Sequence, residues 1–163
     1  MRIRHLLAGA AIFAFAAPAW AQSTPVSFSP EFQTSLEEDF GVREGEVLRT
    51  AVTEAIAREL AQRGVSSTGL SIDVTIVDAE PNRPTMQQLF DEPSLDSSSI
   101  SIGGAELRAV LHNASGQTTE VTHRRYNHSL ADLNGPATTW TEARRAIRQF
   151  AVKVADAYIA TPR

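Results

Sequence analysis

The pattern of hydrophobic and polar residues along the chain predicts two long amphipathic helices. Over residues 43–63, apolar side chains recur at helical spacing while charged residues occupy the other side, and Gly64 ends the pattern. A stripe of the same period predicts a second helix over residues 140–160, with Thr139 and Glu142 placed as in a capping box. The apolar stripes comprise Val47, Leu48, Ala51, Val52, Ala55, Ile56 and Leu60 in the first helix and Trp140, Ala143, Ile147, Phe150, Val154 and Tyr158 in the second.

Between these helices the period changes to the strict alternation that is typical of half-buried strands. Residues 70–78 alternate most clearly, and further strands are predicted over residues 105–113 and 117–127. Turn-forming residues separate the last two strands, which indicates a hairpin. We expect an odd-numbered loop of three residues that brings Val121 opposite Leu107.

The region before the first long helix predicts two shorter elements. Val26 and Phe28 alternate as in an edge strand, and residues 30–40 form a short helical pattern that Gly41 ends. Because each long helix must bury its apolar stripe, the elements together predict an α+β fold. The expected architecture is a three-stranded antiparallel meander with both long helices packed on one face, plus the N-terminal edge strand and short helix.

The first 21 residues match a cleavable signal for export. A positive start is followed by an apolar run over residues 6–17 and by Ala19 and Ala21 at the cleavage positions. That run is shorter than the roughly 20 apolar residues that a membrane-spanning helix needs. We therefore expect a signal peptide over residues 1–21, a single α+β domain over residues 22–163, and a protein that is periplasmic or secreted without a membrane span.

Charge and cysteine content narrow the function classes. The signal contains two of the 15 basic residues and none of the 19 acidic residues, so the predicted mature domain carries 13 basic residues against 19 acidic ones. Such an acidic domain is a poor candidate for binding nucleic acid or anionic membranes, which depend on Lys and Arg contacts. The chain has no cysteine, which excludes disulfides, thiolate metal sites and cysteine nucleophiles.

Two segments offer candidate binding residues. Asn82 and Arg83 lie in a proline-bounded loop, where they would contact a carboxylate or phosphate of a partner; the alternative is a rigid turn that satisfies its own backbone. The third predicted strand contains Arg124, Arg125 and Tyr126 in succession, of which Arg124 and Tyr126 are the candidate binding residues. With the basic side of the last helix they would form a positive patch for an envelope protein or an anionic ligand, unless the region is only a mixed charged surface. The helix residues of that patch are Arg144, Arg145 and Arg148.

No catalytic, cofactor or metal motif stands out, so an enzyme is not the favoured interpretation. The chain lacks the G-x-S-x-G serine elbow. A metal site from His112 and His123 with Asp132 or Glu120 would have suitable ligands, but their spacing matches no metal motif. The alternative function is an envelope hydrolase with a His–carboxylate pair. Its base would be His123 or His128, and its carboxylate would be Asp78, Glu80 or Asp132.

Three segments of the chain resemble small proteobacterial envelope proteins of unknown function. They are residues 58–64 (RELAQRG), residues 74–78, which end a strand in aspartate, and residues 114–116 (ASG) in the turn. The resemblance covers about residues 43–160 and implies an envelope location and an α+β fold, but no activity. Many of those relatives are lipoproteins, and this chain differs because it lacks the lipid-bearing cysteine. Because no catalytic constellation is present, we expect a non-enzymatic binding or assembly module that uses a sheet face or edge. The polar third strand, residues 118–127, is the candidate edge for strand addition.

Overall fold

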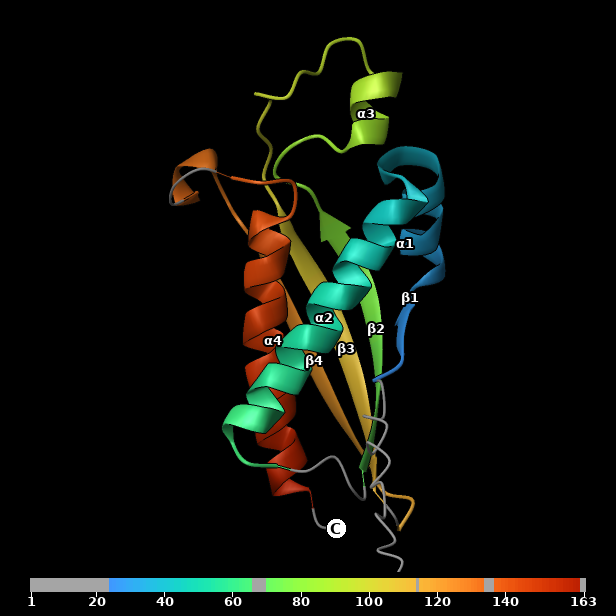
Figure 1. Ribbon diagram of the computed structural model, residues 1–163, viewed down its shortest axis with the longest axis vertical. Coiled ribbons are helices and arrows are strands. Elements are labelled where there is room, and N and C mark those ends of the chain that lie inside the picture. The colour runs from blue at the N-terminus through green and yellow to red at the C-terminus, as the bar shows by residue number, and fades with distance from the viewer. Residues whose placement is uncertain (1–23, 66–69, 114, 134–136, 162–163) are drawn as a thin grey trace, which may run out of the picture.

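The computed structural model describes residues 24–65, 70–113, 115–133 and 137–161, so the predicted signal lies outside the described residues. Four strands form one mixed sheet, flanked by helices (Figure 1). The strands are β1 (Val26–Phe28), β2 (Leu70–Glu80), β3 (Gly104–Asn113) and β4 (Thr118–Tyr126). The helices are α1 (Pro30–Ser35), the π-helical η1 (Leu36–Phe40), α2 (Val42–Gln62), α3 (Met86–Asp91), the 3₁₀ turn η2 (Leu130–Asp132) and α4 (Thr141–Ala160).

The sheet has the strand order β1-β2-β3-β4. The expected antiparallel meander is present as β2, β3 and β4, but the sheet as a whole is four-stranded and mixed because β1 adds to β2 in parallel. The parallel pairing follows from the connection, since α1, η1 and α2 carry the chain back to the end of the sheet where β1 started. Ser29 continues the pairing by donating its backbone N–H to the Ile76 carbonyl at 3.0 Å.

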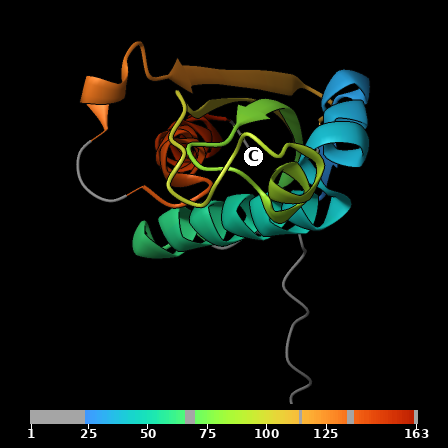
Figure 2. The ribbon, with the colours of Figure 1, turned by 90° about the horizontal axis from the view of Figure 1, so that it is seen from above.

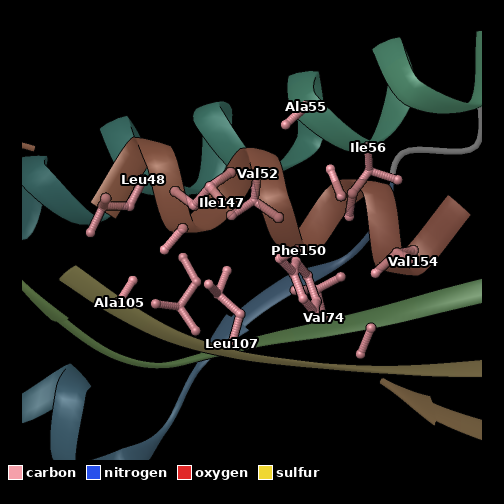
Figure 3. Packing of buried hydrophobic residues seen from close by; sticks show 14 of the residues in the cluster. Leu48, Val52, Ala55, Ile56, Val74, Ala105, Leu107, Ile147, Phe150 and Val154 are labelled. Carbon is pink, nitrogen blue, oxygen red and sulfur yellow. The ribbon is translucent and has the colours of Figure 1, made fainter. Parts of the chain in front are cut away.

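Both long helices lie on the same face of the sheet (Figure 2). Their apolar stripes meet the inward residues of β2 and β3 in one core (Figure 3). Leu48, Val52 and Ile56 of α2 and Phe150 and Val154 of α4 are at most 1% exposed. No helix among the described residues is long and apolar enough to cross a membrane.

The β3–β4 hairpin confirms the odd-numbered turn but corrects the pairing. Asn113 donates its N–H to the Gln117 carbonyl at 3.1 Å, and Gly116 has a positive φ of 81°, while Ala114 lies outside the described residues. Val121 faces Ala109 and not Leu107, so the predicted register is wrong by two residues. The cause is the Asn113 side chain, whose Oδ1 accepts the N–H groups of Ser115 and Gln117 and so places the turn. Because a shift of two residues preserves the facing, Val121 still points into the core.

Candidate binding surfaces

Asn82 lies at the base of the long loop between β2 and β3, and it is fully buried. Its backbone N–H donates to the carbonyl of Thr139 at 2.7 Å, and its carbonyl accepts the N–H of Ser101 at 2.9 Å. Its side-chain Oδ1 accepts the N–H of Glu142 at 2.8 Å, in the first turn of α4. A residue far away in the sequence therefore caps this helix.

The predicted capping box of Thr139 and Glu142 is wrong. The N-cap of α4 is Trp140, whose side chain makes no capping hydrogen bond. Glu142 instead turns its carboxylate toward two arginines, so the Asn82 amide supplies the acceptor that the helix start needs. Gly103 makes room for this amide, because a Cβ there would lie 2.5 Å from Asn82 Nδ2.

Arg83 also holds the loop together. Its Nε donates to the carbonyl of Ala137 at 2.5 Å, and its Nη1 donates to the carbonyl of Ser97 at 2.8 Å. The structure thus gives Asn82 and Arg83 internal roles, in agreement with the alternative of a turn that satisfies its own backbone. That either side chain contacts a partner stays a prediction.

The loop presents the short helix α3 in a defined position. Thr85 and Gln88 form a complete capping box, with hydrogen bonds of 3.2 and 3.1 Å. Gln87 ties α3 to η1, since its Nε2 donates to the Glu38 carbonyl at 2.9 Å. Met86 and Phe90, one helical turn apart, are nevertheless 78% and 88% exposed. An ordered helix thus holds two large apolar side chains in water.

A mostly apolar groove of about 1020 Å³ opens beside α3. Its floor includes Phe40, which packs edge-on against Trp140 with ring centroids 6.0 Å apart. Trp140 is held in turn by Glu44, whose Oε2 accepts the indole N–H at 2.6 Å. The groove is lined by the first half of α2, by α3 and by Arg144 of α4. Its lining is Phe40, Gly41, Val42, Arg43, Glu44, Glu46, Val47, Thr50, Ala51, Glu54, Met86, Gln87 and Arg144.

The second surface is the open face, the side of the sheet opposite α2 and α4 (Figure 2). Polar and charged side chains pair across neighbouring strands on this face. His112 Nε2 lies 3.0 Å from Asp73, Arg108 lies 3.4 Å from Glu120, and Arg124 lies 3.3 Å from Glu106. The residues of the open face include Asp73, Thr75, Asp78, Glu106, Arg108, Val110, His112, Glu120, Thr122, Arg124 and Tyr126.

Arg124 and Tyr126, two predicted binding residues, lie side by side on the open face. The Arg124 guanidinium is 5.3 Å from the centroid of the Tyr126 ring. The Tyr126 hydroxyl reaches across β3 and donates to the Asp78 carboxylate. This path exists because β3 has Gly104 at that point, where a Cβ would lie 2.7 Å from the Tyr126 ring. Burial, and then the Asp78 hydrogen bond and charge, raise the Tyr126 pKa, so the hydroxyl keeps its proton.

The predicted positive patch is divided between the two faces of the sheet, because neighbouring strand residues point to opposite faces. Arg124 lies on the open face, whereas Arg125 points toward α4 and places Nη2 3.1 Å from Oε2 of Glu142. Arg145 completes this cluster: its Nη1 lies 3.0 Å from Oε1 of Glu142 and hydrogen-bonds to Oε2 at 3.3 Å. The Glu142 side chain is 1% exposed, and its carboxylate offsets part of the positive charge of the two arginines, which are 29% and 30% exposed.

The His–carboxylate pairs of the hydrolase alternative are not formed among the described residues. His123 Nε2 lies 3.2 Å from Gln149 Oε1, and Asp132 accepts the backbone N–H groups of His128 and Ser129. Burial, and then the positive charge of Lys153, lower the His123 pKa. In the part of the chain that the structure describes, no group of three or more His, Cys, Asp or Glu residues is placed to hold a metal ion.

Sequence reasoning missed the groove, although one signal pointed to it. Phe90 and Met86 are apolar residues outside both long stripes, in a loop with no core position for them.

Comparison with models of protein families gives no match, and comparison with curated proteins gives no significant match. The resemblance to small envelope proteins therefore stays a prediction, and the candidate function rests on the geometry of these surfaces.

Proposed function

We propose that this protein is an exported, non-enzymatic binding or assembly module that holds an apolar segment of an envelope protein in the groove beside α3. The observation that carries the proposal is the pair of exposed apolar residues, Met86 and Phe90, on a helix that is capped and tied in place. Burying each of these side chains against a partner would contribute about 1.5–3 kcal/mol.

The rim of the groove supports a protein partner. Arg43, Glu46, Glu54 and Arg144 surround the apolar lining with both signs of charge. An apolar centre with a mixed polar rim is typical of protein–protein interfaces. Phe90 extends the apolar surface beyond the groove itself, so a partner that covers both would be larger than a small molecule.

Photo-cross-linking in living cells tests the proposal. The full chain is expressed with a photoreactive phenylalanine analogue in place of Phe90, and the control carries the analogue at Arg58, on exposed α2 surface outside the groove lining. We expect a specific envelope adduct from position 90 and none from position 58. Equal adducts from both positions, or no adduct at position 90, would contradict the proposal.

The captured partner then allows a quantitative test with purified proteins. We expect the double substitution Met86→Ser and Phe90→Ser to weaken binding at least tenfold, which corresponds to about 1.4 kcal/mol. Arg124→Ala and Tyr126→Ala test the open face, where the sequence placed the contacts. If these substitutions weaken binding and the α3 substitutions do not, the groove is the wrong site.

Export is part of the proposal and is tested separately. Cell fractionation should recover the protein from the periplasm or the medium, and its intact mass should correspond to a chain that starts at Gln22. A protein that keeps residues 1–21 in the cytoplasm would contradict the export assignment without bearing on the groove.

A further inference from the structure

Among the described residues, the β4 edge of the sheet is long, regular and not paired with another strand. Within the described part of the chain, β4 pairs only with β3, over nine residues and without a register shift. It contains no proline. Natural proteins usually blunt such edges with short strands, bulges or prolines, since a free edge is a template for another strand. β4 lies at the rim of the sheet in Figure 2.

The hydrogen bonds of the hairpin show which backbone groups face the free edge. Asn113 and Gln117 form a hydrogen-bonded pair, and the N–H of Asn127 donates to the Gly103 carbonyl at 3.0 Å. In an antiparallel ladder, hydrogen-bonded pairs alternate with pairs whose groups point away. The backbone groups that point outward therefore belong to Thr118, Glu120, Thr122, Arg124 and Tyr126.

We propose that two copies of this protein associate by pairing β4 with β4 in antiparallel orientation, with Thr122 on the two-fold axis. In this register the outward backbone groups of each strand meet those of the other, and they form about ten hydrogen bonds. Glu120 of each copy lies opposite Arg124 of the other, so the symmetric interface contains two cross-strand ion pairs.

The charge pattern selects this register over its neighbours. Moving the axis to Glu120 or to Arg124 would place like charges directly opposite each other, which is destabilising. Moving the axis to Val121 would place Glu120 opposite Thr122 of the other copy, and moving it to His123 would place Glu120 opposite Tyr126 of the other copy. Either register would lose both ion pairs. Only the axis at Thr122 also pairs the strand over its whole length.

The pairing extends a network that each copy already has. Glu106 and Arg124 pair within one copy, at 3.3 Å, and Arg108 and Glu120 pair at 3.4 Å. Across the axis, Arg124 of one copy would lie between its own Glu106 and Glu120 of the other, so the charges alternate from strand to strand. The two open faces become one continuous surface. This inference does not depend on the groove, which lies on the other side of the sheet.

A charge-reversal experiment tests the register. Sedimentation equilibrium of the purified exported protein, from micromolar to millimolar concentration, should show a reversible monomer–dimer equilibrium. Glu120→Arg alone and Arg124→Glu alone should each weaken self-association at least tenfold, because each places like charges across the axis. Mixing these two variants should restore dimers, since an all-basic strand then faces an all-acidic one. The control Glu37→Arg, at an exposed position on η1, should dimerise like the wild type.

Two further variants keep the test independent of charge effects on folding. Thr122→Pro removes an N–H that points away from β3, so it should abolish dimers while leaving the circular dichroism spectrum unchanged. In this cysteine-free chain, Thr122→Cys should form disulfide-linked dimers under mild oxidation, whereas Thr118→Cys, distant from its own symmetry mate, should not. A protein that stays monomeric at millimolar concentration, or equal cross-linking from both cysteines, would overturn the proposal.

Discussion

The two faces of the sheet carry similar ion pairs in opposite surroundings. On the covered face, Glu142 is 1% exposed and meets Arg125 and Arg145. On the open face, Glu106 is 40% exposed and meets Arg124, which is 73% exposed. Water competes for every open-face pair but is excluded from the Glu142 carboxylate. The covered pairs therefore hold the fold together, while the open pairs remain available for contacts with another molecule.

The largest effect should come from the core of the covered face. Phe150 is completely buried against the strands and α2. We expect Phe150→Ala to lower the free energy of unfolding by about 3–5 kcal/mol, through lost apolar burial and the cavity it leaves. Urea denaturation measures this change. On the open face, Thr122→Ala should change the same quantity by less than about 0.5 kcal/mol; similar losses at both positions would contradict the two-face comparison.

The buried ion-pair cluster gives the next largest effect. Glu142→Leu should lower the free energy of unfolding by about 3 kcal/mol, which is near the lower end of the range for breaking a buried ion pair. The loss is at that end because the side chains of Arg125 and Arg145 are 29% and 30% exposed and can turn partly to water. The matched control is Glu106→Gln on the open face, which should cost less than about 1 kcal/mol. Equal losses in chemical denaturation would show that burial does not separate the two pairs.

The contact between Gly103 and the Asn82 amide should give a smaller, coupled effect. Gly103→Ala should cost about 1–3 kcal/mol, because the added Cβ meets the amide at 2.5 Å. In an Asn82→Ala background the amide is gone, so the same substitution should cost less. A double-mutant cycle from four denaturation curves measures this difference. Strictly additive losses would mean that Gly103 is needed for another reason.

The smallest effect concerns protonation of His123. Its lowered pKa means that the folded protein favours the neutral ring, so this contribution to stability is present above the usual pKa of 6.5 and is lost as the pH falls below it. NMR titration of the ring should give a pKa below 6.5. Lys153→Met should raise that pKa, and Gln149→Leu should lower it further, because the Gln149 hydrogen bond favours the charged form. Shifts of the opposite sign would contradict the assigned causes.

Much of the fold was predictable because periodic patterns report burial directly. The alternation over residues 70–78 and the stripe that contains Ile147 and Phe150 predicted β2 and α4 within a few residues. The candidate surfaces were harder to predict. The sequence placed Arg124 together with the basic side of α4, but strand alternation separates them onto opposite faces. Nothing local in the sequence shows that Asn82 would cap a helix that begins 59 residues later, since the hydrogen bond exists only when the loop is folded.

The sequence by itself determined the two long helices, the three long strands and the inward facing of their apolar residues, together with the acidic charge and the absence of cysteine chemistry. These properties depend on residue type and on contacts within a few positions. Only the tertiary structure decided that β1 joins in parallel and that α3 exposes Phe90 beside a groove. Such features depend on which distant segments cover a surface and which leave it bare, and local periodicity carries no information about that choice.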